Sequence, residues 1–261
     1  MALISQHFLA ANPLAASDSW WLDAYAEIQR VLCPPSEFPC VFSQNAFKRE
    51  LLLFSFVENA KPSSLDLSAD DLLQYLRLCE SWDGSINSAS PLLVVFSLEA
   101  AQFATVDKYQ EFGWSILRGW HDRDEAPWPA GVSRDPHFPF WSMCFAGTQI
   151  FVNMSSPAHQ VRRSRNLGKY FVFVVNPRER FDLVAGDNPD GRKIRHHIRN
   201  RIAAYDGVSH CQQLGSYQAG ELEWWQYGII EQNAERFDRC PFDIPKRQED
   251  ADADRLSTIA K

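Results

Sequence analysis

The fold expected for this chain is decided by residues 141–176, WSMCFAGTQIFVNMSSPAHQVRRSRNLGKYFVFVVN. The stretch opens with an apolar run over 141–153 and closes with a second one over 170–175, and both runs have the composition of buried β-strands. A short basic segment with His159 and several arginines separates them. A histidine between two buried strands is costly to bury unless it has a ligand or a partner, so His159 is the residue to explain.

The basic segment is expected to form a short helix. Ser156 suits the N-cap position, and Pro157 suits the first helical position. His159 would then lie in the first turn, with Arg162 and Arg163 about one turn further along the same face. A ligand and cationic groups would thus be presented together.

Apolar strand patterns and amphipathic helix patterns are interleaved along the rest of the chain, without a regular repeat. We expect strands over 38–42, 51–57, 91–100, 141–152, 170–175 and 181–184, and helices that begin near Ser19, Ser68, Thr105 and Asp190. Several strand pairs look hairpin-like. The predicted class is therefore α+β, or mixed α/β, with a central, largely antiparallel sheet flanked by helices.

The length suits one large domain. We expect an N-terminal helical segment over 1–37, a catalytic domain over 38–245 and a flexible tail over 246–261, because the tail has no apolar pattern.

Bulk composition narrows the class of protein. The net charge of −7 and the pI near 5.5 argue against a general nucleic-acid binder. Six scattered cysteines indicate reduced thiols, the first residues lack the basic start of a signal peptide, and no apolar run is long enough to span a bilayer. A cytoplasmic protein with no membrane partner is expected. The chain also has no Walker loop, GxGxxG, GxSxG or HExxH motif, so nucleotide, hydrolase and zincin interpretations lack their parts.

The first candidate site is His159 with its neighbouring arginines. A haem pocket needs a neutral imidazole for the iron, apolar walls for the macrocycle and cations for the propionates, and this segment carries the imidazole and the cations. The plainer interpretation is a surface histidine on a basic helix.

Two further sets of residues carry possible chemistry. His121, Asp122, Asp124 and His137 include two imidazoles and carboxylates, the ingredients of a non-haem iron site, although capping of a helix and a loop explains them as well. Cys40 could supply a thiolate to haem, but inside an apolar strand it is more simply a small core residue.

Several blocks, taken in order, carry a resemblance to a known family. They are FPCVFSQNAFKRELL (38–52), WSILRGWHDRDEAPWP (114–129), FWSMCFAGTQIFV (140–152), PAHQVRRSRNLG (157–168), GDNPDGRKIRHHIRNRIAAYD (186–206) and LGSYQAGELEWWQYGI (214–229). Over roughly 38–233 the chain resembles the YqcI/YcgG family.

Characterised members of that family are haem-dependent N-oxygenases. The resemblance implies a monooxygenase with haem b that hydroxylates a guanidino or amino nitrogen of arginine or a related small molecule, with electrons from an external donor. It implies these roles: His159 as iron ligand, Arg162, Arg163 and Arg165 as propionate contacts, Trp141 as a wall of the cofactor pocket, and His121 and Asp122 as catalytic residues near oxygen or substrate. Asp122, Asp124 or Glu125 could hold a guanidinium.

Two other functions remain open from the sequence. A haem-binding or gas-sensing module would bind haem without turnover, and a non-haem iron oxygenase would use His121, His137 and a carboxylate. Substrate identity, the electron donor and a homodimeric assembly are left undecided.

Overall fold

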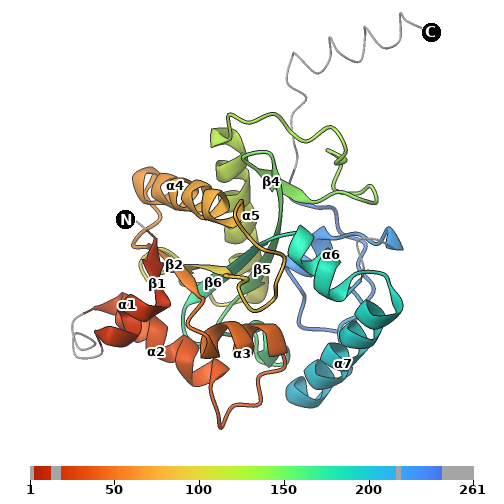
Figure 1. The fold of residues 1–261 in the computed structure, drawn as a ribbon, viewed down its shortest axis with the longest axis horizontal. Coiled ribbons are helices and arrows are strands. Elements are labelled where there is room, and N and C mark those ends of the chain that lie inside the picture. The colour runs from red at the N-terminus through yellow and green to blue at the C-terminus, as the bar shows by residue number, and fades with distance from the viewer. Residues whose placement is uncertain (1–2, 13–18, 216–218, 243–261) are drawn as a thin grey trace, which may run out of the picture.

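One six-stranded sheet lies at the centre of the computed structural model, which describes residues 3–12, 19–215 and 219–242 (Figure 1). The strands are β1 (Ile4–Ser5), β2 (Leu53–Val57), β3 (Leu92–Phe96), β4 (Met143–Phe145), β5 (Thr148–Ser155) and β6 (Phe171–Pro177). Across the sheet they follow the order β1-β2-β3-β6-β5-β4. β2 and β3 are parallel, and the other neighbouring pairs are antiparallel. The predicted α+β class with a largely antiparallel sheet is confirmed.

Helices cover both faces of this sheet. They are α1 (Gln6–Ala11), α2 (Trp20–Leu32), α3 (Val41–Lys48), α4 (Pro62–Cys79), α5 (Val106–Arg123), α6 (Glu179–Ala185), α7 (Pro189–Asp206) and α8 (Trp224–Tyr227), with a 3-10 turn at Arg163–Arg165. α4 and α5 pack on one face, while α2 and α3 pack on the other, below the strands in Figure 1. α6 and α7 lie beside the second group.

The central strand β3 explains why the 91–100 run is apolar throughout. Leu92, Val94 and Phe96 belong to the core on the α4/α5 face. Leu93 and Val95 belong to the core on the α2/α3 face. Successive side chains of a strand point to opposite faces, so a strand covered on both faces has no solvent-facing position for polar residues.

Two of the long helices, α5 and α7, begin at capping side chains. Thr105 Oγ1 accepts a hydrogen bond from the Lys108 amide at 3.4 Å at the start of α5. The Asn188 side chain accepts from the Gly191 amide at 2.8 Å at the start of α7, and Gly207, with φ of 74°, ends that helix. The helices predicted near residues 19, 105 and 190 are confirmed. The start predicted at Ser68 is wrong, because Ser68 is buried inside α4, which begins at Pro62.

The strand predicted over 38–42 is wrong. Cys40 is instead the N-cap of α3, and its Sγ accepts a hydrogen bond from the Ser43 amide at 3.5 Å. Ala46 and Phe47 are the buried residues of this helix. A short apolar run has no reliable periodicity, and here the helix was hidden because its polar residues follow the run rather than alternate with it.

Two other strand predictions need correction. The run over 141–152 forms a hairpin rather than one strand, because Ala146 and Gly147 turn the chain with φ of 50° and 72° between β4 and β5. The run over 181–184 belongs to helix α6, where Arg178 pairs with Asp182 at 3.2 Å one helical turn later.

The helix predicted around His159 is also wrong. Residues 157–162 form turns and bends, and only Arg163–Arg165 is helical, as a 3-10 turn. The Ser156 hydroxyl bonds to the His159 ring instead of capping a helix, and the Asn166 amide donates to the carbonyls of Pro157 and His159. These side-chain bonds replace the backbone bonds that a helix would make.

The N-terminal segment contributes to the same core as the sheet, because Leu22 and Ile28 of α2 pack in one cluster with Phe54 of β2. The predicted tail over 246–261 lies outside the described residues. Among the residues that the structure describes, no helix is long and apolar enough to cross a membrane.

Candidate active site

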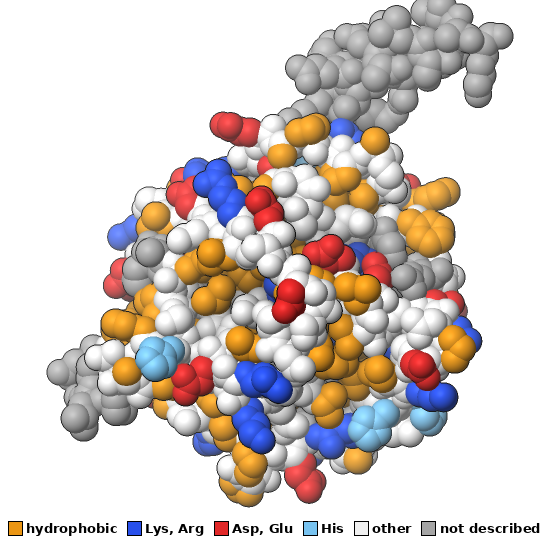
Figure 2. Space-filling view, in the orientation of Figure 1, with side chains coloured by type: hydrophobic (Ala, Val, Ile, Leu, Met, Phe, Trp, Pro, Cys, Tyr) orange, Lys and Arg blue, Asp and Glu red, His pale blue; other side chains and the backbone are white. Residues whose placement is uncertain are grey.

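The most developed pocket is a cleft on the α2/α3 face of the sheet, beside α6 and α7. Its floor comes from β3, β5 and β6, through Leu93, Phe151, Asn153, Ser155 and Val174. Its walls come from the start of α3, from the 164–167 segment and from one side of α6 and α7. The cavity volume is about 250 Å³, and the space out to its solvent-open mouth is about 1420 Å³. In Figure 2 apolar side chains run between basic ones where α3 and α7 lie. A mostly apolar cleft with a few convergent polar groups is the usual form of a small-molecule site.

Cys40 is the thiol of this cleft. It is half-buried at the N-terminus of α3, where the Ser43 amide points at its sulfur. The segment before it is fixed to α7, because Arg201 donates to the carbonyls of Phe38 and Pro39, each at 3.0 Å. The sulfur is thereby held at the edge of the cleft, where it can meet a ligand.

Arg165 brings a buried positive charge to the cleft wall. Its side chain is only 7% exposed, and its Nη1 has no hydrogen-bond partner among the described residues. Burial lowers its pKa to about 10, so the guanidinium stays protonated at neutral pH. An unpaired buried cation is costly unless an anion joins it.

Acidic groups stand on the α6 and α8 side of the cleft. Glu223 is 2% exposed, pairs with Arg178 at 3.0 Å and accepts from the Tyr227 hydroxyl at 2.9 Å. Desolvation raises the pKa of Glu223 to about 7 despite the attraction of Arg178. Asp182 lines the same wall, and burial raises its pKa as well. Two carboxyl groups with raised pKa values thus face an apolar space.

Two arginines of α7 stand nearer to solvent. Arg195 donates to the carbonyls of Ala185 and Gly186 and pairs with Asp187 at 3.0 Å. Arg199 lies one turn later, half-buried, and donates to the Leu214 carbonyl. Both arginines line the cleft, so its α7 side carries cationic groups that remain accessible to a ligand.

His159 lies outside this cleft and is 2% exposed. Its Nε2 donates to the Ile229 carbonyl at 3.0 Å, and its Nδ1 lies 3.0 Å from the Ser156 hydroxyl. Burial lowers the pKa of the ring, and the two bonds satisfy a neutral imidazole. Iron ligation by His159 stays a prediction, and it would require one of these bonds to break.

The three arginines near His159 lie in different surroundings. Arg162 is buried in a polar network, where it donates to the Ser209 carbonyl at 2.6 Å and to Asn233. Arg163 is exposed and stacks over the Tyr205 ring at 4.9 Å. Of the residues predicted to bind the cofactor, Arg165 is the one that the structure brings into the cleft.

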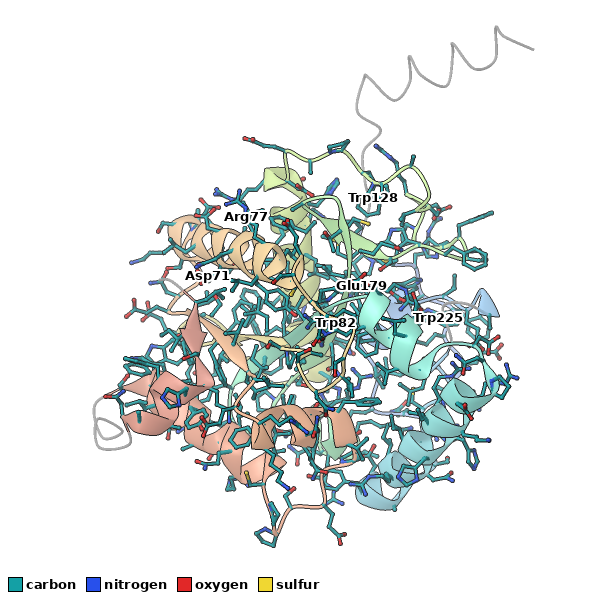
Figure 3. The ribbon with its side chains drawn as sticks, in the orientation of Figure 1. Asp71, Arg77, Trp82, Trp128, Glu179 and Trp225 are labelled. Carbon is teal, nitrogen blue, oxygen red and sulfur yellow. The ribbon has the colours of Figure 1, made fainter. Side chains whose placement is uncertain are left out.

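The predicted catalytic residues lie at the far end of α5. The His121 ring packs edge-on against Trp128 at 5.7 Å, and Asp122 is exposed in a separate surface hollow with Asp124 and Glu125. Figure 3 shows Trp128 at the top of the molecule, while α7 lies at the lower right. These residues therefore do not share a site with the cleft.

The remaining predicted residues serve packing. Trp141 is 1% exposed and contacts Tyr227 and Phe242. His137 accepts a hydrogen bond from the Cys240 amide at 3.1 Å. In the part of the chain that the structure describes, no three His, Cys, Asp or Glu side chains are grouped to hold a metal ion.

Sequence reasoning missed Glu223, Asp182 and Arg178. Glu223 lies far from Arg178 and Asp182 in the chain, and it meets them only because α6 follows β6 directly while α8 packs on β5. One weak signal was present in the block over 214–229, where Glu223 is an acidic residue within an aromatic run.

Comparison with known proteins identifies the family of this chain. Residues 28–243 match the YqcI/YcgG family. The chain belongs to that family. A protein of Streptomyces lavendulae, which its name gives provisionally as the N(omega)-hydroxy-L-arginine synthase DcsA, is 52% identical over 86% of this chain and 84% of its own length. Two uncharacterised family members of Bacillus subtilis (strain 168) are each 28% identical. YcgG is matched over 80% of this chain and 82% of its own length, and YqcI over 85% and 87%. No solved structure gives a significant match.

Proposed function

We propose that this protein hydroxylates a guanidino nitrogen of arginine or a closely related compound in the cleft. One relative with 52% identity carries a name for the synthesis of N(omega)-hydroxy-L-arginine, and this observation carries the proposal. In such a reaction one atom of dioxygen enters an N–H bond, while the other leaves as water with two electrons from an external donor and two protons.

The residues of the cleft support substrate binding at its acidic wall. Carboxylates recognise a planar guanidinium through paired hydrogen bonds, and Asp182 and Glu223 are the carboxylates on this wall. Arg178 holds Glu223 at 3.0 Å and Asp182 at 3.2 Å, so both side chains are oriented before a substrate enters. Apolar neighbours exclude water from the reacting nitrogen. Phe151 and Phe181 are two of them, and their ring centroids lie 4.9 Å apart.

Haem is the cofactor that we propose for this cleft, and the residues present fit it. Cys40 offers a sulfur ligand, the floor is apolar, and Arg195 and Arg199 near the mouth can pair with propionates. When bound through a thiolate, haem supplies the activation of dioxygen that N-hydroxylation requires. The unpartnered Nη1 of Arg165 in the same cleft is a further sign that an anionic group belongs there.

Cys40 is favoured over His159 as the iron ligand, because its sulfur lines the cleft while both His159 nitrogens are engaged. We expect Cys40→Ser to lose or strongly alter the Soret absorption band, and His159→Ala to keep it. Cys33→Ser is the matched control, since Cys33 is also half-buried but lies outside the cleft. An unchanged Soret band in Cys40→Ser would exclude this ligand, and loss of the band in His159→Ala alone would support the imidazole.

The function is tested with the full chain expressed with haem supplementation. The purified protein is incubated with L-arginine, dioxygen and a chemical or protein reductant, and the products are analysed by mass spectrometry. We expect arginine that has gained one oxygen atom on its guanidino group, formed only when haem, reductant and oxygen are all present. Haem binding without product would favour a haem-binding module, and product from haem-free protein would refute the haem requirement.

A further inference from the structure

The surroundings of Arg165 contain more positive than negative charge. Arg162 and Arg165 are both buried here, and Asp206 is the carboxylate that acts electrostatically on Arg165. The Asp206 carboxylate already has partners. It accepts hydrogen bonds from the Ser164 amide at 2.8 Å and from the Ser164 hydroxyl at 2.9 Å, and its Oδ2 lies 3.9 Å from Nη1 of Arg162. Two guanidinium groups therefore share one carboxylate, and the other groups that act favourably on Arg165 are the cysteines Cys211 and Cys40.

Arg165 also differs from the other arginines of the cleft. Arg178 pairs with Glu223 and Asp182, Arg195 pairs with Asp187, and Arg199 donates to the Leu214 carbonyl. For Arg165, the buried Nη1 has no hydrogen-bond partner among the described residues, although the residue is only 7% exposed. A guanidinium removed from water without a partner is prepared for a planar anion.

The two polar walls of the cleft have opposite character. Arg165 stands with Ser155 and Ser164 near the end of β5 that leads to Ser156. Asp182 and Glu223 stand with Phe151, nearer the start of β5, where the Arg178 amide donates to the Gln149 carbonyl. Residues 151 and 155 of one strand are separated by about 13 Å, so Arg165 and the two carboxyl groups occupy different ends of the cleft.

We propose that Arg165 binds the α-carboxylate of the substrate, so that the cleft selects a complete amino acid rather than a simple guanidine. The inference rests on the proposed function, in which the acidic wall receives the guanidinium. A molecule with a carboxylate at one end and a guanidinium at the other matches both walls. Arg195 and Arg199 at the mouth remain for the propionates of the cofactor.

The test compares L-arginine with agmatine, which is arginine without its carboxylate, by calorimetric titration of the holoprotein. We expect the wild type to bind arginine about 10- to 100-fold more tightly than agmatine, as for a charge-assisted contact. Arg165→Gln should remove this preference and leave agmatine binding unchanged. Arg165→Lys, which keeps the charge, should restore part of it. Arg163→Gln is the matched control, because Arg163 is exposed and outside the cleft.

The possible outcomes separate this inference from its alternatives. A wild type that binds both ligands equally would overturn it, and so would an Arg165→Gln variant that keeps the preference. Loss of haem absorbance in Arg165→Gln with the preference intact would assign the residue to a propionate instead. If arginine is preferred through Arg165 but never hydroxylated, the proposed function fails while the carboxylate site stands.

Discussion

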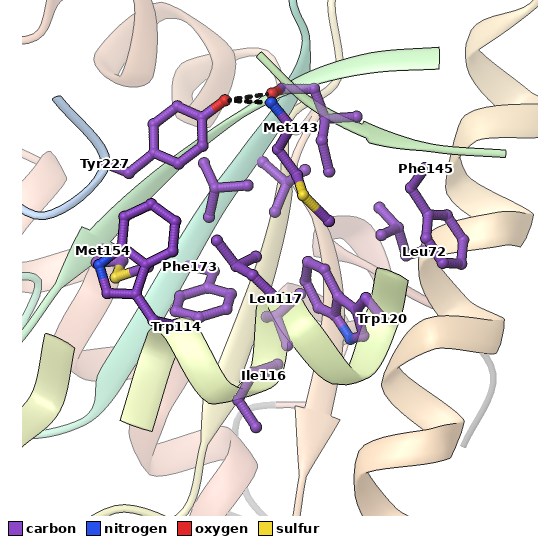
Figure 4. Close-up of a cluster of buried hydrophobic side chains, with 14 of the residues drawn as sticks. Leu72, Trp114, Ile116, Leu117, Trp120, Met143, Phe145, Met154, Phe173 and Tyr227 are labelled. Carbon is purple, nitrogen blue, oxygen red and sulfur yellow. Dashed lines mark hydrogen bonds between the residues drawn. The ribbon is translucent and has the colours of Figure 1, made fainter. Parts of the chain in front are cut away.

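The two faces of the sheet differ in how completely they are covered. On the α4/α5 face, α4, α5 and α8 close over the strands, and Figure 4 shows Trp114, Leu117 and Trp120 packed against Phe173, with the Tyr227 hydroxyl bonded to the Met143 amide. On the other face, α2 and α3 cover the β2 and β3 side, while the cleft occupies the space over β5 and β6. A site forms where covering helices stop short, because a complete cover leaves no room for a ligand.

The polar groups of the two faces differ as well, because those on the packed face have partners and those on the cleft face border open space. On the packed face they join secondary structure together, as when Trp120 Nε1 donates to Ser68 Oγ at 2.9 Å. On the cleft face, Cys40, Arg165 and Asp182 border empty space. Burial alone therefore does not separate polar groups that hold the fold together from polar groups that can bind a ligand. The useful distinction is whether a buried polar group already has its partner.

The sharpest test of this difference uses two adjacent valines of β6. Val175 is fully buried on the packed face, and Val174 is half-buried and lines the cleft. We expect Val175→Ala to lower the free energy of unfolding by about 2 to 4 kcal/mol, because the lost methyl groups leave a cavity. Val174→Ala should cost about 1 kcal/mol or less. Urea denaturation measures both, and equal costs would refute the proposed difference between the faces.

A second test concerns the pH dependence contributed by Glu223. Its pKa is about 7 in the folded state, against 4.5 for an ordinary glutamate, so the folded state binds a proton more strongly than the unfolded state. Stability from this group is present below pH 4.5 and is lost as pH rises toward 7, by at most about 3 kcal/mol. Glu223→Gln should flatten this part of the profile in urea titrations from pH 4 to 8. An identical slope in both proteins would contradict the raised pKa.

The smallest expected effect is at His159, and its sign is opposite. Burial lowers the pKa of His159 below 6.5, so the unfolded state binds the proton more strongly. Stability from the neutral ring is present above pH 6.5 and is lost as pH falls below it. His159→Gln should lessen the loss of stability on the acid side, measured by thermal melting. A steeper acid loss in the variant would show that the ring is charged in the folded state.

Much of the fold could be predicted from local patterns. Thr105 marks the start of α5, α7 begins beside the predicted Asp190, and the apolar run of β3 indicates a strand covered on both faces. Apart from the start of the long helix α4, the errors fell on short segments. Cys40 caps a helix that looked like a strand, and Ala146 turns a hairpin that looked like a single strand. In such segments one side-chain bond or one turn residue outweighs a weak propensity.

The candidate site was predictable only in part. Cys40 and Arg165 were both considered from the sequence, the first as an alternative ligand and the second as a propionate contact, and both line the cleft. His159 attracted attention because a buried histidine needs partners. It has them in Ser156 and Ile229, and the carbonyl of Ile229 comes from a segment 70 residues away.

The sequence by itself determined the family through its matched blocks. It also determined the α+β class and the positions of α5 and α7, because these depend on composition and periodicity within contiguous segments. Only the tertiary structure decided which polar side chains share a space. Arg165 and Glu223 are separated in the chain by β6, α6 and α7, yet they line one cleft. Whether a buried charge is satisfied or open to a ligand depends on neighbours distant in sequence, so it is settled by packing.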